Sequence, residues 1–237
     1  MTEASRAFAY LTGALSEGDR PDAVGRKFTP DGQPVTCRGN TAICHVAKGS
    51  DAFAALIAAQ DRLKAGPLAD GFTFLPPESF HMTIFEGVID YTRSADRWPG
   101  HLPTDTPIDT VTEDFAARLR NIGLAQRLQA SPTGIFGGFS VRMTGTDASE
   151  EALLRLTRDQ LQEATNLIRT DHEAYGFHIT LGYNLRWFSP DEADAIIALS
   201  DEVARELAAR VPRITLGPVE FCAFDTMHHF ETLQRID

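Results

Sequence analysis

Two stretches of this chain, almost a hundred residues apart, repeat one pattern. SFHMTIFEGV occupies residues 79–88 and GFHITLGY occupies residues 176–183, so that His81 and His178 stand 97 residues apart. In each stretch a His-x-Thr triplet is followed by an apolar residue, within a run of apolar and β-branched residues that is typical of a β-strand. A strand that occurs twice with the same polar residues predicts a repeated structural unit.

The elements that precede the two strands are also alike. An apolar run at 40–46 and an alternating run at 136–145 are each expected to form a strand. A helix should follow each of them, beginning after Ser50 in the first case and at Ser149 in the second, because a serine side chain accepts hydrogen bonds from the free N–H groups of a first helical turn. The order strand, helix, His-x-Thr strand therefore occurs twice.

These repeats predict an α/β (α+β) fold with an internal duplication. We expect two pseudo-twofold-related lobes of mostly antiparallel sheet, with helices on the outer faces and a central groove. The chain has 237 residues, which suffices for one such unit, so we expect a single bilobal domain over residues 1–237. Its predicted parts are an N-terminal helix and loop (1–36), a first-motif half (37–89), a loop insertion (90–110) and a second-motif half (111–237) whose first helix begins at Thr112.

The faces of the two strands indicate where the polar residues point. Side chains two residues apart on a strand lie on the same face of the sheet. His81 therefore shares a face with Thr83, and His178 shares a face with Thr180, while the intervening apolar residues point toward the helices. If a twofold axis relates the two halves, the two His-Thr pairs should face each other across the groove.

Paired histidines have a specific chemical use. Placed on either side of a phosphorus atom, they can act as the general base and the general acid of a phosphoester cleavage. Imidazole has an ordinary pKa of about 6.5, so both protonation states exist near neutral pH. The hydroxyls of Thr83 and Thr180 can donate hydrogen bonds to phosphoryl oxygens. One His-x-Thr triplet is common by chance, but its recurrence after the same elements favours a catalytic pair that needs no metal and no cofactor.

This pairing resembles the signature of the two-histidine (2H) phosphoesterase superfamily, in particular the group of LigT-like RNA ligases and cyclic nucleotide phosphodiesterases. HMTI at 81–84 and HITL at 178–181 match both motifs, and the resemblance covers about residues 40–226. The flanking segments resemble an uncharacterised branch of the superfamily. The resemblance implies a bilobal fold, a metal-independent 2′,3′-cyclic phosphodiesterase reaction, the two histidines as acid and base, and the two threonines as phosphate ligands.

Other polar residues are weaker candidates. Arg142 shares a strand face with Ser140 and Thr144, which favours a phosphate clamp and a solvated sheet arginine equally. Glu86 is expected to end its strand or to bond to the backbone. A structural role is expected for His45, and the remaining histidines lack the spacing of metal ligands: they are His101, His172, His228 and His229.

Three aromatic residues follow the second motif. Tyr183, Trp187 and Phe188 could form a platform for a nucleobase, but at this spacing we expect them to be core and loop anchors.

Charge and cysteine content limit the partners. The net charge is −11, from 22 basic and 33 acidic residues, and this balance disfavours duplex nucleic acid, whose binding depends on Lys and Arg contacts to phosphates. We expect a small phosphorylated substrate or an RNA end as partner. The three cysteines are too few for a disulfide framework, and no apolar run is long enough for a membrane span. These features predict a cytoplasmic protein that does not bind membranes.

The leading hypothesis is a hydrolase: a metal-independent phosphoesterase that opens a 2′,3′-cyclic phosphate on a nucleotide or an RNA end. The alternative is a non-catalytic module that binds a nucleotide or an RNA end in the same groove. The intact pair of histidines favours the enzyme, since binding alone requires no acid–base pair. A metal-dependent hydrolase built from the scattered histidines is a third hypothesis, and the weakest.

Overall fold

The computed structural model describes residues 2–236, which contain ten β-strands and five α-helices. The strands are β1 (Gly39–His45), β2 (Phe72–Phe74), β3 (His81–Ile89), β4 (Leu128–Phe136), β5 (Ser140–Gly145), β6 (His178–Thr180), β7 (Gly182–Asn184), β8 (Ile214–Leu216), β9 (Val219–Thr226) and β10 (His229–Ile236). The helices are α1 (Glu3–Leu11), α2 (Asp51–Lys64), α3 (Ile108–Leu119), α4 (Ala148–Thr165) and α5 (Pro190–Arg210).

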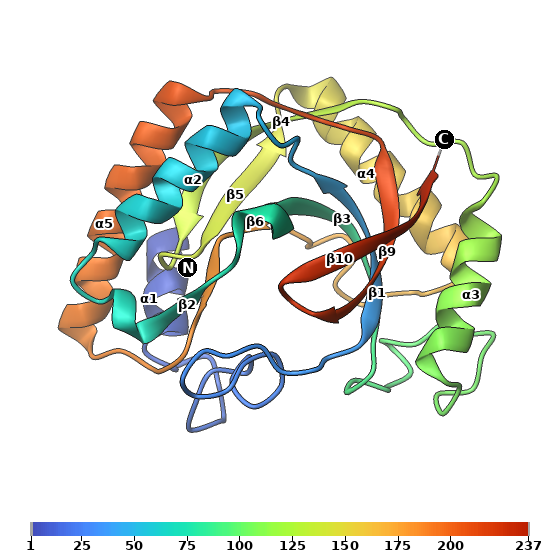
Figure 1. The fold of residues 1–237 in the computed structure, drawn as a ribbon, viewed down its shortest axis with the longest axis horizontal. Helices are drawn as coiled ribbons and strands as arrows, with labels where there is room; N and C mark the ends of the chain where they lie inside the picture. Colours follow the sequence, from blue (N-terminus) through green and yellow to red (C-terminus); the bar gives the residue numbers. More distant parts are fainter. Residues whose placement is uncertain (1, 237) are drawn as a thin grey trace.

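Eight of the strands form one antiparallel sheet in the order β10-β9-β1-β3-β6-β5-β4-β8. β2 and β7 form a separate antiparallel pair. The large sheet curls into a half-barrel around an open side, and the helices lie outside it (Figure 1). The predicted α+β class and the mostly antiparallel sheet are confirmed, whereas the internal duplication stays a prediction.

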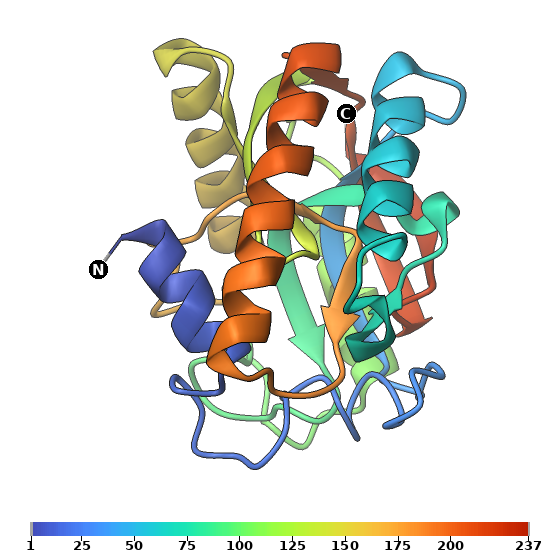
Figure 2. The same ribbon diagram turned by 90° about the vertical axis from the view of Figure 1, so that its left-hand side faces the viewer.

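Helices cover the convex face of the sheet. α4 packs against β3, β4 and β5, and α5 packs against β4, α1 and α2. Figure 2 shows α5 with α1 and α4 to one side of it and α2 to the other. The apolar residues of the two motif strands lie in the core beneath these helices, as the strand periodicity predicts: Met82, Ile84, Ile179 and Leu181. No helix within residues 2–236 is long and apolar enough to cross a membrane.

The chain path departs from the predicted division of the sequence. The last two strands, β9 and β10, pair through β1 with the strand of the first motif, whereas β8 pairs with β4 at the opposite edge. Residues 111–237, predicted as one second-motif half, therefore contribute to both ends of the sheet. Because these pairings join strands that are distant in sequence, no local sequence pattern predicts them.

The stretch GFHITLGY is not one strand. The backbone leaves the large sheet after Thr180, and β7 pairs with β2. The buried amide of Gln60 fills the junction, where its Nε2 donates to the carbonyl oxygens of Leu75 and Leu181 at 2.8 Å each. The amide thereby joins the backbone on either side of the strand change, where Leu75 N–H also donates to the Leu181 carbonyl oxygen at 2.9 Å.

Among the helix starts predicted at Ser50, Ser149 and Thr112, only Ser50 is the observed cap, that of α2. At the start of α5, Ser189 forms a capping box. At α4 the cap is Asp147 and not Ser149, because the aspartate carboxylate accepts from two N–H groups of the first turn. α3 begins a turn before Thr112, directly after a proline, which suits a helix start because it lacks an N–H group.

The core beneath the motif strands should be the most sensitive part of the fold. Ile179, in the middle of β6, is fully buried in the core beneath the helices. Ile179→Ala should lower the free energy of unfolding by about 2–5 kcal/mol, which corresponds to a decrease in Tm of about 4–20 °C. Thermal unfolding measures this, and Leu156→Ala is the matched control because Leu156 is 53% exposed on α4. Equal Tm values for the two variants would contradict this account of the core.

Candidate active site

The two His-x-Thr strands are hydrogen-bonded neighbours in the middle of the sheet. β3 and β6 pair antiparallel, with Met82 opposite Ile179. This register places each histidine beside the threonine of the other strand. His81 and His178 are then diagonal neighbours with a backbone separation of roughly 7–8 Å. The predicted arrangement across a groove between two lobes is thus replaced by a side-by-side arrangement on one sheet.

The four motif side chains line one cavity on the concave face. His81, Thr83, His178 and Thr180 all contribute to it, and its volume is about 400 Å³. Each of the four is partly exposed. Cavities of roughly 300–1,000 Å³ are typical of sites for small ligands, so this one can hold a nucleotide-sized molecule.

Both histidines are held in the same orientation by their own strands. Nδ1 of His81 lies 2.7 Å from the carbonyl oxygen of Ser79, and Nδ1 of His178 lies 2.9 Å from that of Gly176. A carbonyl oxygen only accepts hydrogen bonds, so Nδ1 carries the proton in both rings. Nε2 is left in both as the nitrogen that can accept or deliver a proton in the cavity.

Burial controls the protonation of the pair. It lowers the pKa of His81 to about 4, with smaller contributions in the same direction from His45 and His178. Burial also lowers the pKa of His178, and nearby basic side chains add to this while Glu86 opposes it. Both imidazoles are therefore neutral at pH 7 in the free protein.

Sequence reasoning missed a tyrosine in the cavity. Tyr175 lines it, and the buried hydroxyl has no hydrogen-bond partner among residues 2–236. The ring is 5.9 Å from that of His178, and the guanidinium of Arg158 covers it at 3.8 Å. No motif marks this position, because the residue lies in a loop. Its hydroxyl is a third donor near Thr83.

The cavity also contains cations that the sequence did not single out. Arg169, Arg97 and Lys27 line it. Arg169 contacts Asp171 and Glu86 at 3.0 Å each, and Arg97 contacts Asp171 at 3.1 Å. Glu86 was expected to end its strand, whereas it lines the cavity and pairs with an arginine.

Arg142 is not brought into the cavity. It lies opposite His178 in the register of β5 and β6. Its guanidinium is 3.4 Å from the carboxylate of Glu3 in α1 and lies over the ring of Phe136 at 5.4 Å. It is not among the described residues that line the cavity. The pairing with α1 explains why strand periodicity alone misplaces this side chain.

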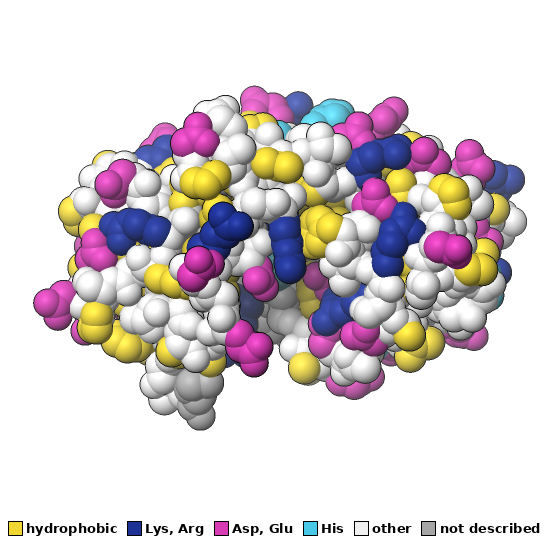
Figure 3. Space-filling model, turned by 90° about the horizontal axis from the view of Figure 1, so that it is seen from below, with side chains coloured by type: hydrophobic (Ala, Val, Ile, Leu, Met, Phe, Trp, Pro, Cys, Tyr) yellow, Lys and Arg dark blue, Asp and Glu magenta, His cyan; other side chains and the backbone are white. Residues whose placement is uncertain are grey.

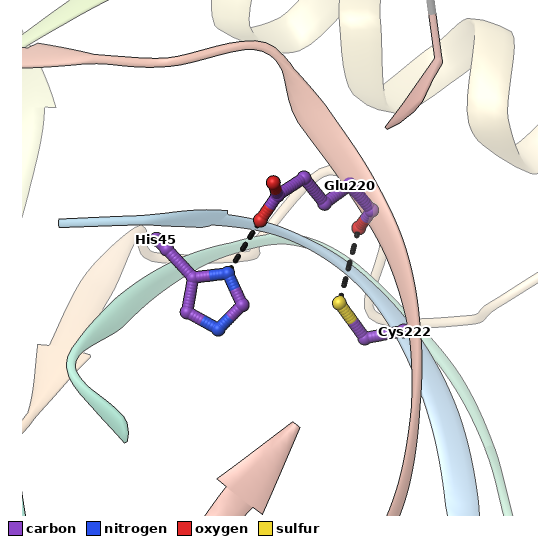
Figure 4. Close-up of side chains that lie close together, drawn as sticks. All are labelled: His45, Glu220 and Cys222. Atoms are coloured by element: carbon purple, nitrogen blue, oxygen red, sulfur yellow. Dashed lines mark hydrogen bonds and ion pairs between the residues drawn. The ribbon is translucent and has the colours of Figure 1, made fainter. Parts of the chain in front are cut away.

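His45 lies behind His81 on the same face of the sheet. The two residues are opposite each other in the register of β1 and β3, and their rings are 6.3 Å apart. Figure 4 shows the His45 ring directed at the carboxylate of Glu220, with Nδ1 2.5 Å from an oxygen, and the thiol of Cys222 directed at the Glu220 carbonyl oxygen. These are metal-binding residue types, but burial raises the pKa of Cys222 to about 12, so the thiol is protonated.

The other histidines lie in separate places. His101 and His172 each contact an aspartate at 2.7 Å, the latter in a surface group with Asp159 and Glu173. His228 and His229 lie at the turn between β9 and β10. Within residues 2–236 these side chains do not join one another in a common site.

The aromatic residues after the second motif divide between two roles. Tyr183 lines the cavity. Phe188 stacks on Phe72 at 5.2 Å, and Trp187 packs edge-on against Tyr10 at 6.4 Å. The expectation of packing roles therefore fits two of the three.

On the face of the molecule in Figure 3, Lys and Arg side chains are interspersed with Asp and Glu side chains.

Comparisons with known proteins place the chain in a family. The family model 2H-phosphodiest, described as a domain of unknown function (DUF1868), matches residues 27–136. A crystal structure of the conserved protein of unknown function ATU0111 from Agrobacterium tumefaciens str. C58 is 33% identical, with 97% of this chain and 98% of that chain covered and a TM-score of 0.91.

A second solved structure, that of TT0787 from Thermus thermophilus, is 16% identical over 84% of this chain and 96% of that one, with a TM-score of 0.43. No curated protein matches the chain. With the family model on residues 27–136 and the Agrobacterium relative along almost its whole length, the chain belongs to the 2H-phosphodiesterase-like family, in a branch described as a domain of unknown function.

Proposed function

We propose that this protein is a metal-independent phosphodiesterase that opens 2′,3′-cyclic phosphates on a nucleotide or an RNA end. The observation that supports this most is the pair of imidazoles in one cavity, each with Nδ1 on a backbone carbonyl and Nε2 left for the ligand. At both His81 and His178, Nδ1 contacts the carbonyl oxygen of the residue two positions earlier, and this shared contact also supports the internal duplication. A cavity that only bound a ligand would have no need of two titratable groups.

The reaction divides between the two histidines. Neutral His81 takes a proton from a water molecule through Nε2 as the water oxygen attacks phosphorus. The bond between phosphorus and one ribose oxygen breaks, and protonated His178 gives its proton to that leaving oxygen. We assign His81 as the base because a pKa of about 4 keeps its imidazole neutral over most of the pH range, and His178 is then the acid. Proton exchange with solvent restores the starting state.

Three hydroxyl groups are available for the phosphate. Thr83 and Thr180 lie beside the imidazoles, and Tyr175 adds a donor from the neighbouring loop. Donors aimed at the non-bridging oxygens stabilise the charge that develops in the transition state. The acid and base occupy fixed places, so the ring should open on one side only and give a single phosphomonoester, either 2′ or 3′.

A screen of the purified protein against the four 2′,3′-cyclic mononucleotides and an oligonucleotide ending in a cyclic phosphate tests this proposal. We expect hydrolysis of at least one, retained in EDTA, because the acid and the base are side chains of this chain. Binding without turnover of any of them would favour the non-catalytic module. Loss of turnover in EDTA that zinc or manganese restores would favour the metal-dependent hydrolase.

A further inference from the structure

The N-terminal segment between α1 and β1 reaches the cavity through one residue. This segment loops beneath the open side of the sheet (Figure 1). Phe28 is fully buried and packs at 5.1 Å from the ring of Tyr183. The neighbouring turn is closed by a hydrogen bond from Val35 N–H to the carbonyl oxygen of Lys27 at 2.8 Å. The hydroxyl of Thr73, in β2, donates to the carbonyl oxygen of Gly32 at 2.9 Å. The segment is thus docked at several points.

Lys27 lies at the wall of the cavity that contains both histidines. Its Nζ is 5.1 Å from the centre of the Tyr183 ring, a cation–π contact. Lys27 is also close enough to His178 to lower the pKa of that imidazole. Burial lowers the pKa of Lys27, but Tyr183 and Tyr91 outweigh it and raise the pKa above its ordinary value. The ammonium is therefore charged at neutral pH.

The three cations of the cavity differ in their partners. Arg169 and Arg97 contact carboxylates, which neutralise them. Lys27 has no carboxylate within 4 Å among residues 2–236 and has aromatic neighbours instead. A half-buried cation without a counter-ion is costly unless a ligand supplies the negative charge. Lys27 is thus the cavity cation that is available to an anion.

We propose that Lys27 binds a second phosphate of the substrate, carried on the 5′ oxygen of the nucleotide whose 2′,3′-cyclic phosphate lies between His81 and His178. This inference rests on the proposed function and specifies its substrate. Tyr183, which the ammonium contacts, lies in β7, outside the large sheet that contains both histidines. Lys27 therefore reaches the cavity from a different wall than the imidazoles, which suits a second phosphate of the nucleotide better than an oxygen of the cyclic phosphate. The 5′ phosphate comes from a mononucleotide or from the preceding linkage of an RNA end.

The test compares three substrates with the same base: a 2′,3′-cyclic nucleotide with a free 5′ hydroxyl, its 5′-phosphorylated form, and a dinucleotide that ends in the cyclic phosphate. For the wild-type protein we expect kcat/KM to be about 10–100-fold higher for the 5′-phosphorylated form than for the free hydroxyl, the usual contribution of a hydrogen bond to a charged group. A dinucleotide rate at the higher level would identify RNA ends as the source, and one at the lower level would identify mononucleotides.

Lys27→Met should reduce this preference to about one, and Lys27→Arg should retain most of it. Lys48→Met is the matched control, because Lys48 is an exposed lysine on the turn before α2 and makes the same change in charge. Equal preference in the wild-type and Lys27→Met proteins, with unchanged Tm values, would overturn the inference.

A binding measurement separates this inference from the proposed catalytic function. Calorimetry with adenosine 3′,5′-bisphosphate and adenosine 3′-monophosphate requires no turnover. Tighter binding of the bisphosphate by the wild-type protein, lost in Lys27→Met and kept in Lys48→Met, would support the second phosphate site even if the cyclic substrates were not hydrolysed. The same affinity for both ligands in the wild-type protein would overturn the site even if hydrolysis were observed.

Discussion

Replacing either cavity histidine by alanine should lower the turnover of a 2′,3′-cyclic phosphate by about 10²–10⁴-fold, the usual contribution of a positioned acid or base. Both rings line the cavity with Nε2 free, so His81→Ala removes the base and His178→Ala removes the acid. Because the two act in one proton-transfer cycle, the double variant should lose much less than the product of the two single losses.

Initial rates and Tm values for each variant decide this prediction. His229→Ala is the control, since His229 is exposed on β10 and lies outside the cavity, and it should keep wild-type turnover. Thr83→Val and Thr180→Val should lose less than the histidine variants, because a hydroxyl donor transfers no proton. Full activity in either histidine variant would contradict the mechanism.

The histidines could be predicted from sequence because the pattern that reveals them is local. Alternation along a strand places His81 and Thr83 on one face, and the repeat at 178–181 shows that the placement is not accidental. The relative position of the two strands is not local. Their direct pairing depends on how the whole sheet closes, so the sequence alone suggested facing lobes where one sheet is found.

The missed features have a conflicting local signal or none. Apolar and polar residues alternate along the first part of β4, but Pro132 argues against a strand that is paired on both sides, as β4 is by β5 and β8. Lys27 and Tyr175 reach the cavity from loops, through contacts that tertiary packing creates. Arg142 illustrates the converse: its face was predicted from alternation, but Glu3 of the N-terminal helix draws its side chain away.

The pH dependence of kcat/KM should have its maximum on the acidic side of neutrality. Free enzyme is productive when one histidine is protonated and the other is neutral. Both pKa values are lowered from the ordinary 6.5, that of His81 to about 4. Below about pH 4 the base His81 is protonated and the rate falls. Above the lowered pKa of His178 the acid loses its proton, and the rate should fall about tenfold for each pH unit.

A pH–rate profile with a 2′,3′-cyclic nucleotide at low concentration measures these limits, which belong to the pair and not to either residue alone. His45→Gln provides a directional check. Since His45 contributes to the low pKa of His81 from the neighbouring strand, its removal should move the acidic limb to higher pH and leave the basic limb in place. A maximum above pH 7, or an acidic limb that does not move in this variant, would show that burial does not set the protonation of this pair, and the assignment of His81 as base and His178 as acid would lose its basis.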